Sequence, residues 1–299
     1  MKPFLLLFSL FFITKMAAQQ TIASAGANGS SITGSVSFTA GQIDYIQESN
    51  TSGDVRQGVQ QPVEFNALLK ARVYLSSVDP ASGLMDDYIK SEPNFPLSDP
   101  YAVAGVYNGR YTHVKNTTLS TTTAQVLAAS GNNAIVDWVF LELRTGTAAS
   151  TTVVNTRAAL LQKDGDVVGM DGVSPVRFYM PDGNYYLALR HRNHLGFRTA
   201  APITLSSNPA VVDFTDNSVA LNGSFPVAGV FNYPDLFTMV GGDGNADGSV
   251  DASDQAAFFA DNGLFDDYSL NTDHNLDGSV DAFDTIVWEI QNGTYEELD

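Results

Sequence analysis

The chain has 299 residues, of which 33 are acidic and 15 basic, so its formal net charge is −18 at pH 7. This excess of negative charge argues against nucleic acid or an anionic membrane as a partner. The sequence contains no cysteine, which excludes disulfides, zinc–thiolate sites and a thiol nucleophile.

Residues 1–18 have the pattern of a secretory signal peptide. Lysine is followed by an apolar run over 4–13 and then by small residues, and we expect cleavage after Ala18. The run is too short to span a bilayer, so we expect no membrane insertion and a secreted, extracellular or cell-surface location. Removal of Lys2 and Lys15 leaves 13 basic against 33 acidic residues, a formal charge of −20.

Residues 19–65 form an N-terminal region that is poor in charge and rich in Gly, Ser, Thr and Gln. Val36, Phe38, Ile43 and Tyr45 recur with the period of a strand, which predicts a β-hairpin or an extended arm. The segments GSVSFTAGQ and QGVQQPVE resemble the N-terminus of secreted surface proteins of the Bacteroidetes. That resemblance implies a compartment and not an activity.

Residues 66–230 contain recurrent strand patterns separated by the turn markers KDGD, MDGVSP, PDGN and SNPA. LLQKDGDVVG is typical of a hairpin joined by Asp-Gly. In IVDWVFLELR both faces are largely apolar: one carries Ile135, Asp137, Val139, Leu141 and Leu143, and the other Val136, Trp138, Phe140, Glu142 and Arg144. We therefore expect a mainly β domain built as an immunoglobulin-like or prealbumin-like β-sandwich.

The same region resembles an uncharacterised β-rich module of large Bacteroidetes surface proteins, often described as haemagglutinin-like. IVDWVFLELR, ALLQKDGDVVGMDGVSPV and NYYLALRHRNHLG carry the resemblance. It implies a surface protein without specifying a mechanism.

A basic cluster, RHRNHLGFR from Arg190 to Arg198, stands out in this acidic chain. One interpretation makes His191 and His194 metal ligands, or the cluster a site for an anionic sugar or carboxylate. We favour a structural interpretation, in which these side chains end a strand, bond neighbouring loops and offset nearby acids. The candidate acids are Asp164, Asp166 and Asp171.

Aromatic residues in the same region offer a second candidate site. They could form a sugar platform, but alternation along strands turns half of them inward and favours core packing. The residues are Tyr185, Tyr186, Trp138, Phe178 and Tyr179. No GxSxG elbow or glycine-rich phosphate loop is present, so we expect a non-catalytic protein, with a glycoside hydrolase as the alternative.

The C-terminal region contains one twelve-residue segment written twice, DGNADGSVDASD and DHNLDGSVDAFD, 30 residues apart. Calcium takes six to eight oxygen ligands at about 2.3 to 2.6 Å, and a loop of this length supplies them from alternate positions. The first candidate set is Asp243, Asn245, Asp247, Ser249, Asp251 and Asp254. The second is Asp273, Asn275, Asp277, Ser279, Asp281 and Asp284. The sequence therefore predicts two calcium ions, with Ser249 and Ser279 acting through their backbone carbonyls.

A helical pattern follows each loop and closes in Asn-Gly, as helix C-termini often do. Phe258, Ile286, Val287 and Ile290 are expected to pack between the two helices. Residues 240–295 with their duplicated DxNxDGxVxxxD pattern resemble a type I dockerin, a small paired-loop domain that docks onto cohesins in cellulose-degrading assemblies. That family often carries Ser-Thr at loop positions ten and eleven, where this chain has Ala252 with Ser253 and Ala282 with Phe283.

We therefore expect an exported, calcium-binding, non-catalytic binding protein of the cell surface or extracellular space. Its domains would be the signal peptide 1–18, the arm 19–65, the β-sandwich 66–230 and the dockerin-like domain 240–295. A cohesin-like protein, another surface protein or a glycan is the expected partner. The alternative is a dockerin-bearing component of a polysaccharide-degrading assembly, either carbohydrate-binding or accessory to a glycoside hydrolase.

Overall fold

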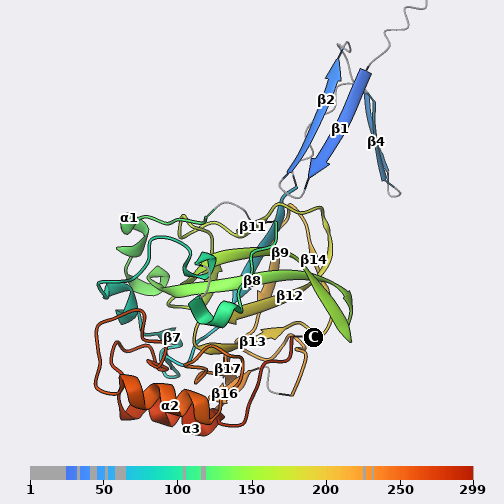
Figure 1. Cartoon of the computed structure of the whole chain (residues 1–299). Coiled ribbons are helices and arrows are strands. Elements are labelled where there is room, and N and C mark those ends of the chain that lie inside the picture. Colours follow the sequence, from blue (N-terminus) through green and yellow to red (C-terminus); the bar gives the residue numbers. More distant parts are fainter. Residues whose placement is uncertain are drawn as a thin grey trace, which may run out of the picture. The chain divides into compact units, whose positions relative to one another are not determined.

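The structure is a computed structural model, and it describes residues 25–31, 34–40, 46–50, 53–57, 65–103, 106–115, 119–224, 227–230 and 232–298 (Figure 1). The chain divides into two compact units, Met1–Val63 and Glu64–Asp299. The predicted signal peptide, with Ile43 and Tyr45, lies outside the described residues.

The first unit contains two antiparallel hairpins. Strand β1 (Ala25–Ser31) pairs with β2 (Gly34–Ala40), and β3 (Ile46–Asn50) pairs with β4 (Gly53–Gln57). Val36 and Phe38, which carry the strand period in the sequence, both lie in β2.

The second unit is mainly β and is built on one nine-stranded sheet, in the order β11-β5-β10-β9-β8-β12-β13, with β14 paired to β12 and β15 paired to β5. All described pairs in it are antiparallel except β15 with β5. Its strands are β5 (Ala67–Arg72), β8 (Ile135–Thr147), β9 (Ser150–Gln162), β10 (Asp166–Val168), β11 (Val176–Phe178), β12 (Gly183–His191), β13 (His194–Arg198), β14 (Ile203–Leu205) and β15 (Ala210–Asp213). Two small hairpins accompany it: β6 (Val78–Asp79) with β7 (Leu84–Met85), and β16 (Ala228–Val230) with β17 (Tyr233–Thr238).

The β9–β10 hairpin confirms the prediction made from LLQKDGDVVG. Val167 pairs with Leu161, and the Gly165 N–H donates a 2.9 Å hydrogen bond to the Gln162 carbonyl. Gly165 has φ +92°, which is accessible to glycine at little cost. The turn residue therefore fixes the register of the hairpin.

Strand β8 is buried on both faces, as predicted. One face joins the main core through Val139, Leu141 and Leu143, and the other joins a second cluster through Trp138 and Phe140. The expected alternation fails at the start of the strand, where Val136 lies in the main core and Ile135 in the second cluster. The cause is a β-bulge between Ile135 and Asp137, which reverses the sidedness of the residues before it.

The helices are few: α1 (Ala124–Leu127), α2 (Ala252–Asp261) and α3 (Ala282–Gln291), with 3-10 turns at Tyr88–Ser91, Pro100–Ala102, Val106–Gly109 and Gly131–Asn133. α2 and α3 lie beside each other (Figure 1). Both end at Asn-Gly as predicted, with Gly263 and Gly293 at φ +90° and +94°. Among the described residues, no helix is long and apolar enough to cross a membrane.

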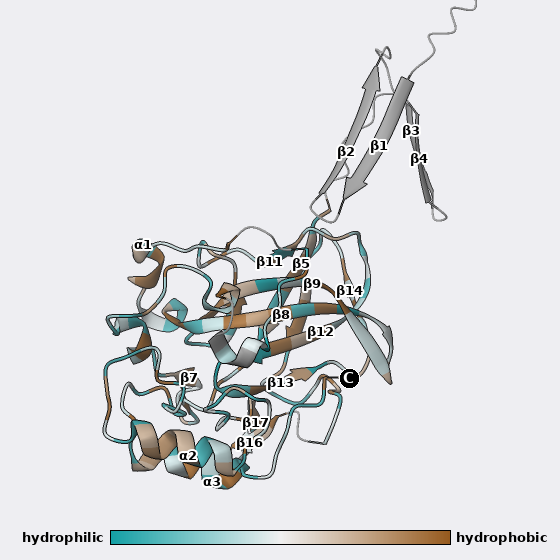
Figure 2. Ribbon diagram, viewed as in Figure 1, coloured by the Kyte–Doolittle hydropathy of each residue, from teal (hydrophilic) through white to brown (hydrophobic). Residues whose placement is uncertain are grey.

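The packing of α2 and α3 differs from the prediction: two of the four residues are exposed, and Val287 lies against a residue outside the helices. Phe258 is buried, and Val287 faces Gly241, but Ile286 and Ile290 are 49% and 70% exposed. Figure 2 shows apolar residues on both helices. α3 rests on the β16–β17 side of the unit through Trp288 and Val287, and Ile290 lines the rim of a depression there with Gly229 and Val230, so neither Ile286 nor Ile290 is enclosed between the helices.

Candidate metal centre

The first candidate loop, residues 243–254, connects the strand region after β17 to α2. Its first carboxylate is held by the loop backbone: Asp243 Oδ1 accepts from the Asp247 N–H at 2.9 Å, and Oδ2 accepts from the Gly248 N–H at 3.1 Å. Its last carboxylate, Asp254, accepts from the N–H groups of Asn245 at 3.1 Å and Asp251 at 2.8 Å. Both terminal carboxylates of the loop are thus held by backbone N–H groups inside the loop.

The second loop, residues 273–284, repeats these four hydrogen bonds and adds a fifth, from the His274 N–H to Asp284 Oδ1 at 2.6 Å. Asp273 accepts from Asp277 N–H at 3.2 Å and from Gly278 N–H at 3.0 Å. Asp284 accepts from Asn275 N–H at 3.0 Å and from Asp281 N–H at 2.8 Å. The duplication visible in the sequence is therefore a duplication of backbone conformation.

Each loop reverses through two residues in the left-handed region. Ala246 and Leu276, at loop position four, have φ of 56° and 60°. Gly248 and Gly278, at position six, have φ of 93° and 87°, where a side chain would be strained. The same backbone reversal at positions four and six of both loops is the conformation that a twelve-residue calcium loop requires.

The carboxylates at the ends of the loops are buried and destabilised as anions. Burial raises the pKa of Asp254 to about 6 and that of Asp284 to about 6. Burial, followed by the charge of Asp284, raises the pKa of Asp273 to about 7. Burial also raises the pKa of Asp243, against the opposing effect of Arg110. A bound cation would relieve this cost.

The donor set of each loop fits a hard cation. The twelve predicted ligands are all oxygen donors and fall in two segments of the sequence, six in each: Asp243, Asn245, Asp247, Ser249, Asp251 and Asp254, and Asp273, Asn275, Asp277, Ser279, Asp281 and Asp284. Within the described residues, no three His, Cys, Asp or Glu side chains converge as a metal centre by themselves. Binding of an ion in either loop would therefore require the carboxylates of that loop to turn toward it, with the Asn245 or Asn275 amide oxygen and the Ser249 or Ser279 carbonyl as further donors.

Each loop forms a backbone hydrogen bond with residues that follow the other loop's helix. Val250 N–H donates to the Thr294 carbonyl at 2.8 Å, beyond α3, and Val280 N–H donates to the Leu264 carbonyl at 2.9 Å, beyond α2. Val250 and Val280 are fully buried. Each apolar residue after a turn therefore binds the end of the other loop's helix, which makes the two loops one structure.

The turn between β12 and β13 inserts between the starts of the two loops. The Asn193 side-chain amide donates a 2.7 Å hydrogen bond to the Asp273 carbonyl, and the Asn193 carbonyl accepts from the N–H groups of Gly242 and Asp243, each at 3.2 Å. Asn193 is fully buried. The sequence shows this residue only as part of the basic cluster, and nothing in its pattern reveals the contact.

Arg192 connects the sheet to the chain just before the second loop. Its guanidinium donates to the Tyr268 carbonyl at 3.1 Å and to Asn271 Oδ1 at 3.0 Å, and it pairs with Asp137 of β8 at 3.0 Å. Burial opposes ionisation of Asp137, but Arg192 and the hydrogen bond from His191 outweigh it and lower the Asp137 pKa to about 2. Asp137 is therefore a buried, charged anchor for the C-terminal segment.

The histidines of the basic cluster are part of the same anchor. His191 Nε2 lies 3.0 Å from Asp137 Oδ2, its Nδ1 lies 3.1 Å from His194 Nδ1, and His194 Nε2 lies 2.9 Å from Ser76 Oγ. Burial lowers the pKa of His191, and burial with the charge of His191 lowers that of His194. Every ring nitrogen has a protein neighbour, which favours the structural interpretation over metal ligation.

The acids that offset the cluster are not those predicted. Asp164 and Asp171 lie in turns and Asp166 begins β10. The arginines instead pair with acids that folding brings near. A chain of alternating charges runs from the sheet to the first loop: Arg144 to Glu142 at 2.7 Å, Glu142 to Arg190 at 3.2 Å, Arg190 to Glu296 at 2.9 Å, then Glu296 to Arg110 and Arg110 to Asp243.

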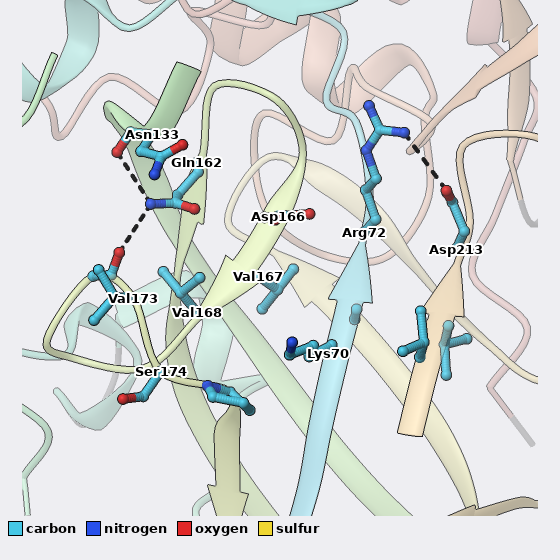
Figure 3. A pocket seen from close by; sticks show the side chains of 15 residues that line it. Lys70, Arg72, Asn133, Gln162, Asp166, Val167, Val168, Val173, Ser174 and Asp213 are labelled. Atoms are coloured by element: carbon cyan, nitrogen blue, oxygen red, sulfur yellow. Dashed lines mark hydrogen bonds and ion pairs between the residues drawn. The ribbon is translucent and has the colours of Figure 1, made fainter. Parts of the chain in front are cut away.

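The aromatic candidates are mostly core residues. Trp138 and Phe178 are fully buried, Tyr185 and Tyr186 nearly so, while Tyr179 is exposed and has the Arg157 guanidinium 4.8 Å from its ring centroid. A depression of about 290 Å³ lies elsewhere, between β5, β10 and β15. Figure 3 shows Lys70, Arg72, Asp166 and Asp213 around it, with Arg72 and Asp213 3.6 Å apart. Its opposite charges face each other, and no aromatic side chain lines it.

Comparison with known proteins assigns no family to this chain. No protein-family model matches it, and no curated protein does. Among solved structures, a chain of an N-terminal interface mutant of a type II cohesin–X–dockerin complex from Acetivibrio cellulolyticus aligns at 16% identity and a TM-score of 0.32, covering 59% of this chain and 90% of that one. A C-terminal interface mutant of the same complex aligns at 15% identity and a TM-score of 0.33, with the same coverage.

Proposed function

We propose that the chain is an exported, non-catalytic binding protein whose C-terminal segment holds two calcium ions. One observation carries the calcium proposal: two loops 30 residues apart share the same backbone hydrogen bonds around buried carboxylates. Asp243 with its five partners would hold one ion, and Asp273 with its five partners the other. When bound, the ions would neutralise carboxylates whose burial otherwise opposes folding.

Thermal unfolding with calcium, magnesium and chelator tests the metal proposal. We expect calcium to raise the midpoint strongly, and magnesium to act weakly because it requires a tighter octahedral shell. The variant Asp243→Ala with Asp273→Ala should lose the calcium effect. Asp182→Asn, at an exposed turn, is the matched control and should keep it. A midpoint that is the same in calcium and in chelator would refute the proposal.

We also propose that α3 presents a docking face for a protein partner. Phe283, Ile286 and Ile290 lie on one side of the helix and are 64%, 49% and 70% exposed. Glu289 borders this face, so a partner with an apolar centre and a basic residue at its rim would complement it. A cohesin-like protein is the expected partner, in line with the dockerin-like character and the immunoglobulin-like or prealbumin-like sandwich that we propose for the chain.

Capture from the source organism's envelope and culture fluid tests docking. The full chain in calcium should retain a specific partner, and Ile286→Asp with Ile290→Asp should abolish retention while leaving the unfolding midpoint near that of the wild type, because both side chains are exposed. Val211→Asp, a 79% exposed valine on β15, is the control and should retain the partner. Equal retention by both variants would exclude this face.

The second candidate function is glycan binding by a surface protein. A related possibility is that the chain is a component of a polysaccharide-degrading assembly. It predicts glycan binding by the β unit that persists when Ile286 and Ile290 are changed. A glycan array with the wild type and the Ile286→Asp, Ile290→Asp variant separates the two candidates. Turnover of a polysaccharide by the wild type would instead support the glycoside hydrolase alternative.

A further inference from the structure

The two loops carry the same ligands but differ in the charged group placed against their outer side. At the first loop, the Arg110 guanidinium pairs with Asp243 Oδ2; the Asp243 side chain is buried and that of Arg110 is 11% exposed. The same guanidinium lies against Gly248: a Cβ on this residue would stand 3.2 Å from Arg110 Nη2. A positive charge thus borders the oxygen of Asp243 that the Gly248 N–H also binds.

At the second loop the matching place holds a negative group. A Cβ on Gly278 would stand 3.0 Å from Glu92 Oε1, with the Tyr88 ring beside it. Glu92 is 6% exposed, and its Oε2 has no hydrogen-bond partner among the described residues. A buried carboxylate with an unpartnered oxygen is costly, and a nearby cation would reduce that cost.

The wider surroundings contain charges of both signs at each loop. Arg110 ends the alternating series that includes Glu296, Arg190, Glu142 and Arg144, and Glu297 lines the same depression beside Asp247. Near the second loop, Arg192 is paired with Asp137, and burial raises the pKa of Glu92 to about 7, so that Glu92 is mostly ionised at pH 8. The difference between the loops is therefore in the group nearest to each Gly turn, Arg110 at the first and Glu92 at the second.

We infer that the two calcium sites are inequivalent: the loop 273–284 binds its ion more tightly, and Arg110 weakens binding at the loop 243–254. This rests on the proposed calcium binding. Because calcium affinity follows the charge around the ion, one opposed unit charge at this range should separate the sites by about tenfold or more. Occupancy of the weaker site then depends on Arg110, which also pairs with Glu296. Calcium binding at residues 243–254 is therefore coupled to the segment that contains Glu296.

Calorimetric titration of the full chain with calcium at pH 8 and low salt tests the inference. We expect two ions with affinities about tenfold or more apart. Asp243→Ala should remove the weaker site and Asp273→Ala the tighter one. Arg110→Gln should strengthen the weaker site by about tenfold, and Glu92→Gln should weaken the tighter site severalfold. Arg110→Lys, which keeps the charge, should stay near the wild type.

Arg177→Gln, an exposed arginine on β11, is the matched control and should leave both affinities unchanged. Circular dichroism verifies that each variant is folded. Two ions of equal affinity, or an identical effect of Arg110→Gln and Arg110→Lys, would overturn the inference while leaving calcium binding intact. Absence of any calcium binding by the wild type would instead refute the proposed function itself.

Discussion

The Asn193 side-chain amide, at the tip of the β12–β13 turn, donates a 2.7 Å hydrogen bond to the backbone carbonyl of Asp273, the first residue of the second loop. The carbonyl of the same Asn193 receives the N–H of Asp243, the first residue of the other loop. One fully buried residue of the sheet therefore fixes the starts of both candidate calcium loops. The loops and the sheet are parts of the same compact unit.

Replacement of Asn193 by alanine should destabilise the unit. The change leaves the buried Asp273 carbonyl without this donor, which costs about 1 to 3 kcal/mol. Urea unfolding in the presence of calcium measures it. Asn208→Ala, at an exposed turn, should change stability by less than about 0.5 kcal/mol. Equal stability of the Asn193 variant and the wild type would mean that this bond does not hold the loops.

The sheet and the C-terminal segment should unfold together. The chain's two tryptophans report on them separately: Trp138 lies in the sheet core, and the Trp288 indole in α3 donates a 2.7 Å hydrogen bond to the Asp251 carbonyl of the first loop. In Trp138→Phe the fluorescence of Trp288 follows the C-terminal segment, and in Trp288→Phe that of Trp138 follows the sheet. We expect the two denaturation midpoints to coincide once each is corrected for the effect of its substitution on overall stability. We also expect chelator to lower both midpoints. Two separate transitions would show that 66–230 and 240–295 are independent domains.

Calcium affinity should fall as the pH is lowered from 8 to 5. In the metal-free chain the pKa values of Asp273, Asp254 and Asp284 are about 7, 6 and 6, above the ordinary 3.8. Calcium requires the ionised forms, so it must displace protons below these values. Calorimetry in buffers of different ionisation enthalpy should detect proton release near pH 6. An affinity independent of pH over this range would contradict the burial of these carboxylates.

The same shifts fix the sign of the contribution that these carboxyl groups make to metal-free stability. A carboxyl group whose folded pKa is raised binds more protons in the folded state, so its contribution falls as the pH rises from about 4 to 7. The buried His191, His194 and His274, whose pKa values burial lowers, act in the opposite direction over the same range. A comparison of the wild type with Asp273→Asn cancels the histidines: in chelator, the stability of the wild type relative to this variant should be greater at pH 5 than at pH 8. Thermal midpoints at the two pH values provide the measurement, and the reverse order would contradict the raised pKa of Asp273.

Asp137 should affect the pH dependence of folding stability in the opposite direction, and at lower pH. Its folded pKa of about 2 lies below the ordinary 3.8, so its stabilisation is present above about pH 4 and is lost as the pH falls toward 2. Asp137→Asn leaves the buried Arg192 without its anionic partner and should cost about 3 to 5 kcal/mol. Guanidinium unfolding at pH 7 measures the loss, with Asp182→Asn as the exposed control. A loss below about 1 kcal/mol would mean that the pair is not an anchor.

The sequence predicts the parts of the molecule that depend on neighbouring residues. The turns at Gly248 and Gly278, the hairpin turn at Gly165 and the helix ends before Gly263 follow from local rules, and the structure has them. The two-sided burial of β8 also follows from its composition. The reversed sides of Ile135 and Val136 do not follow from the composition of the strand, because a β-bulge depends on the pairing with the neighbouring strand.

Contacts between distant segments could not be predicted. The pairing of Arg110 with Asp243, 133 residues away, and that of Arg192 with Asp137, 55 residues away, depend on the final topology. The same holds for Ile286 and Ile290, whose apolar character indicated helix packing although their exposure depends on where α3 rests. A single sequence shows that charges are present but not which ones meet.

Native mass spectrometry of the chain, after exchange into calcium and after exchange into chelator, tests the central claim most directly. We expect two calcium ions per chain, one in Asp243→Ala and one in Asp273→Ala, and none when both are changed or when chelator is present. Two ions retained by the doubly changed chain, or none on the wild type in calcium, would contradict the assignment of these loops.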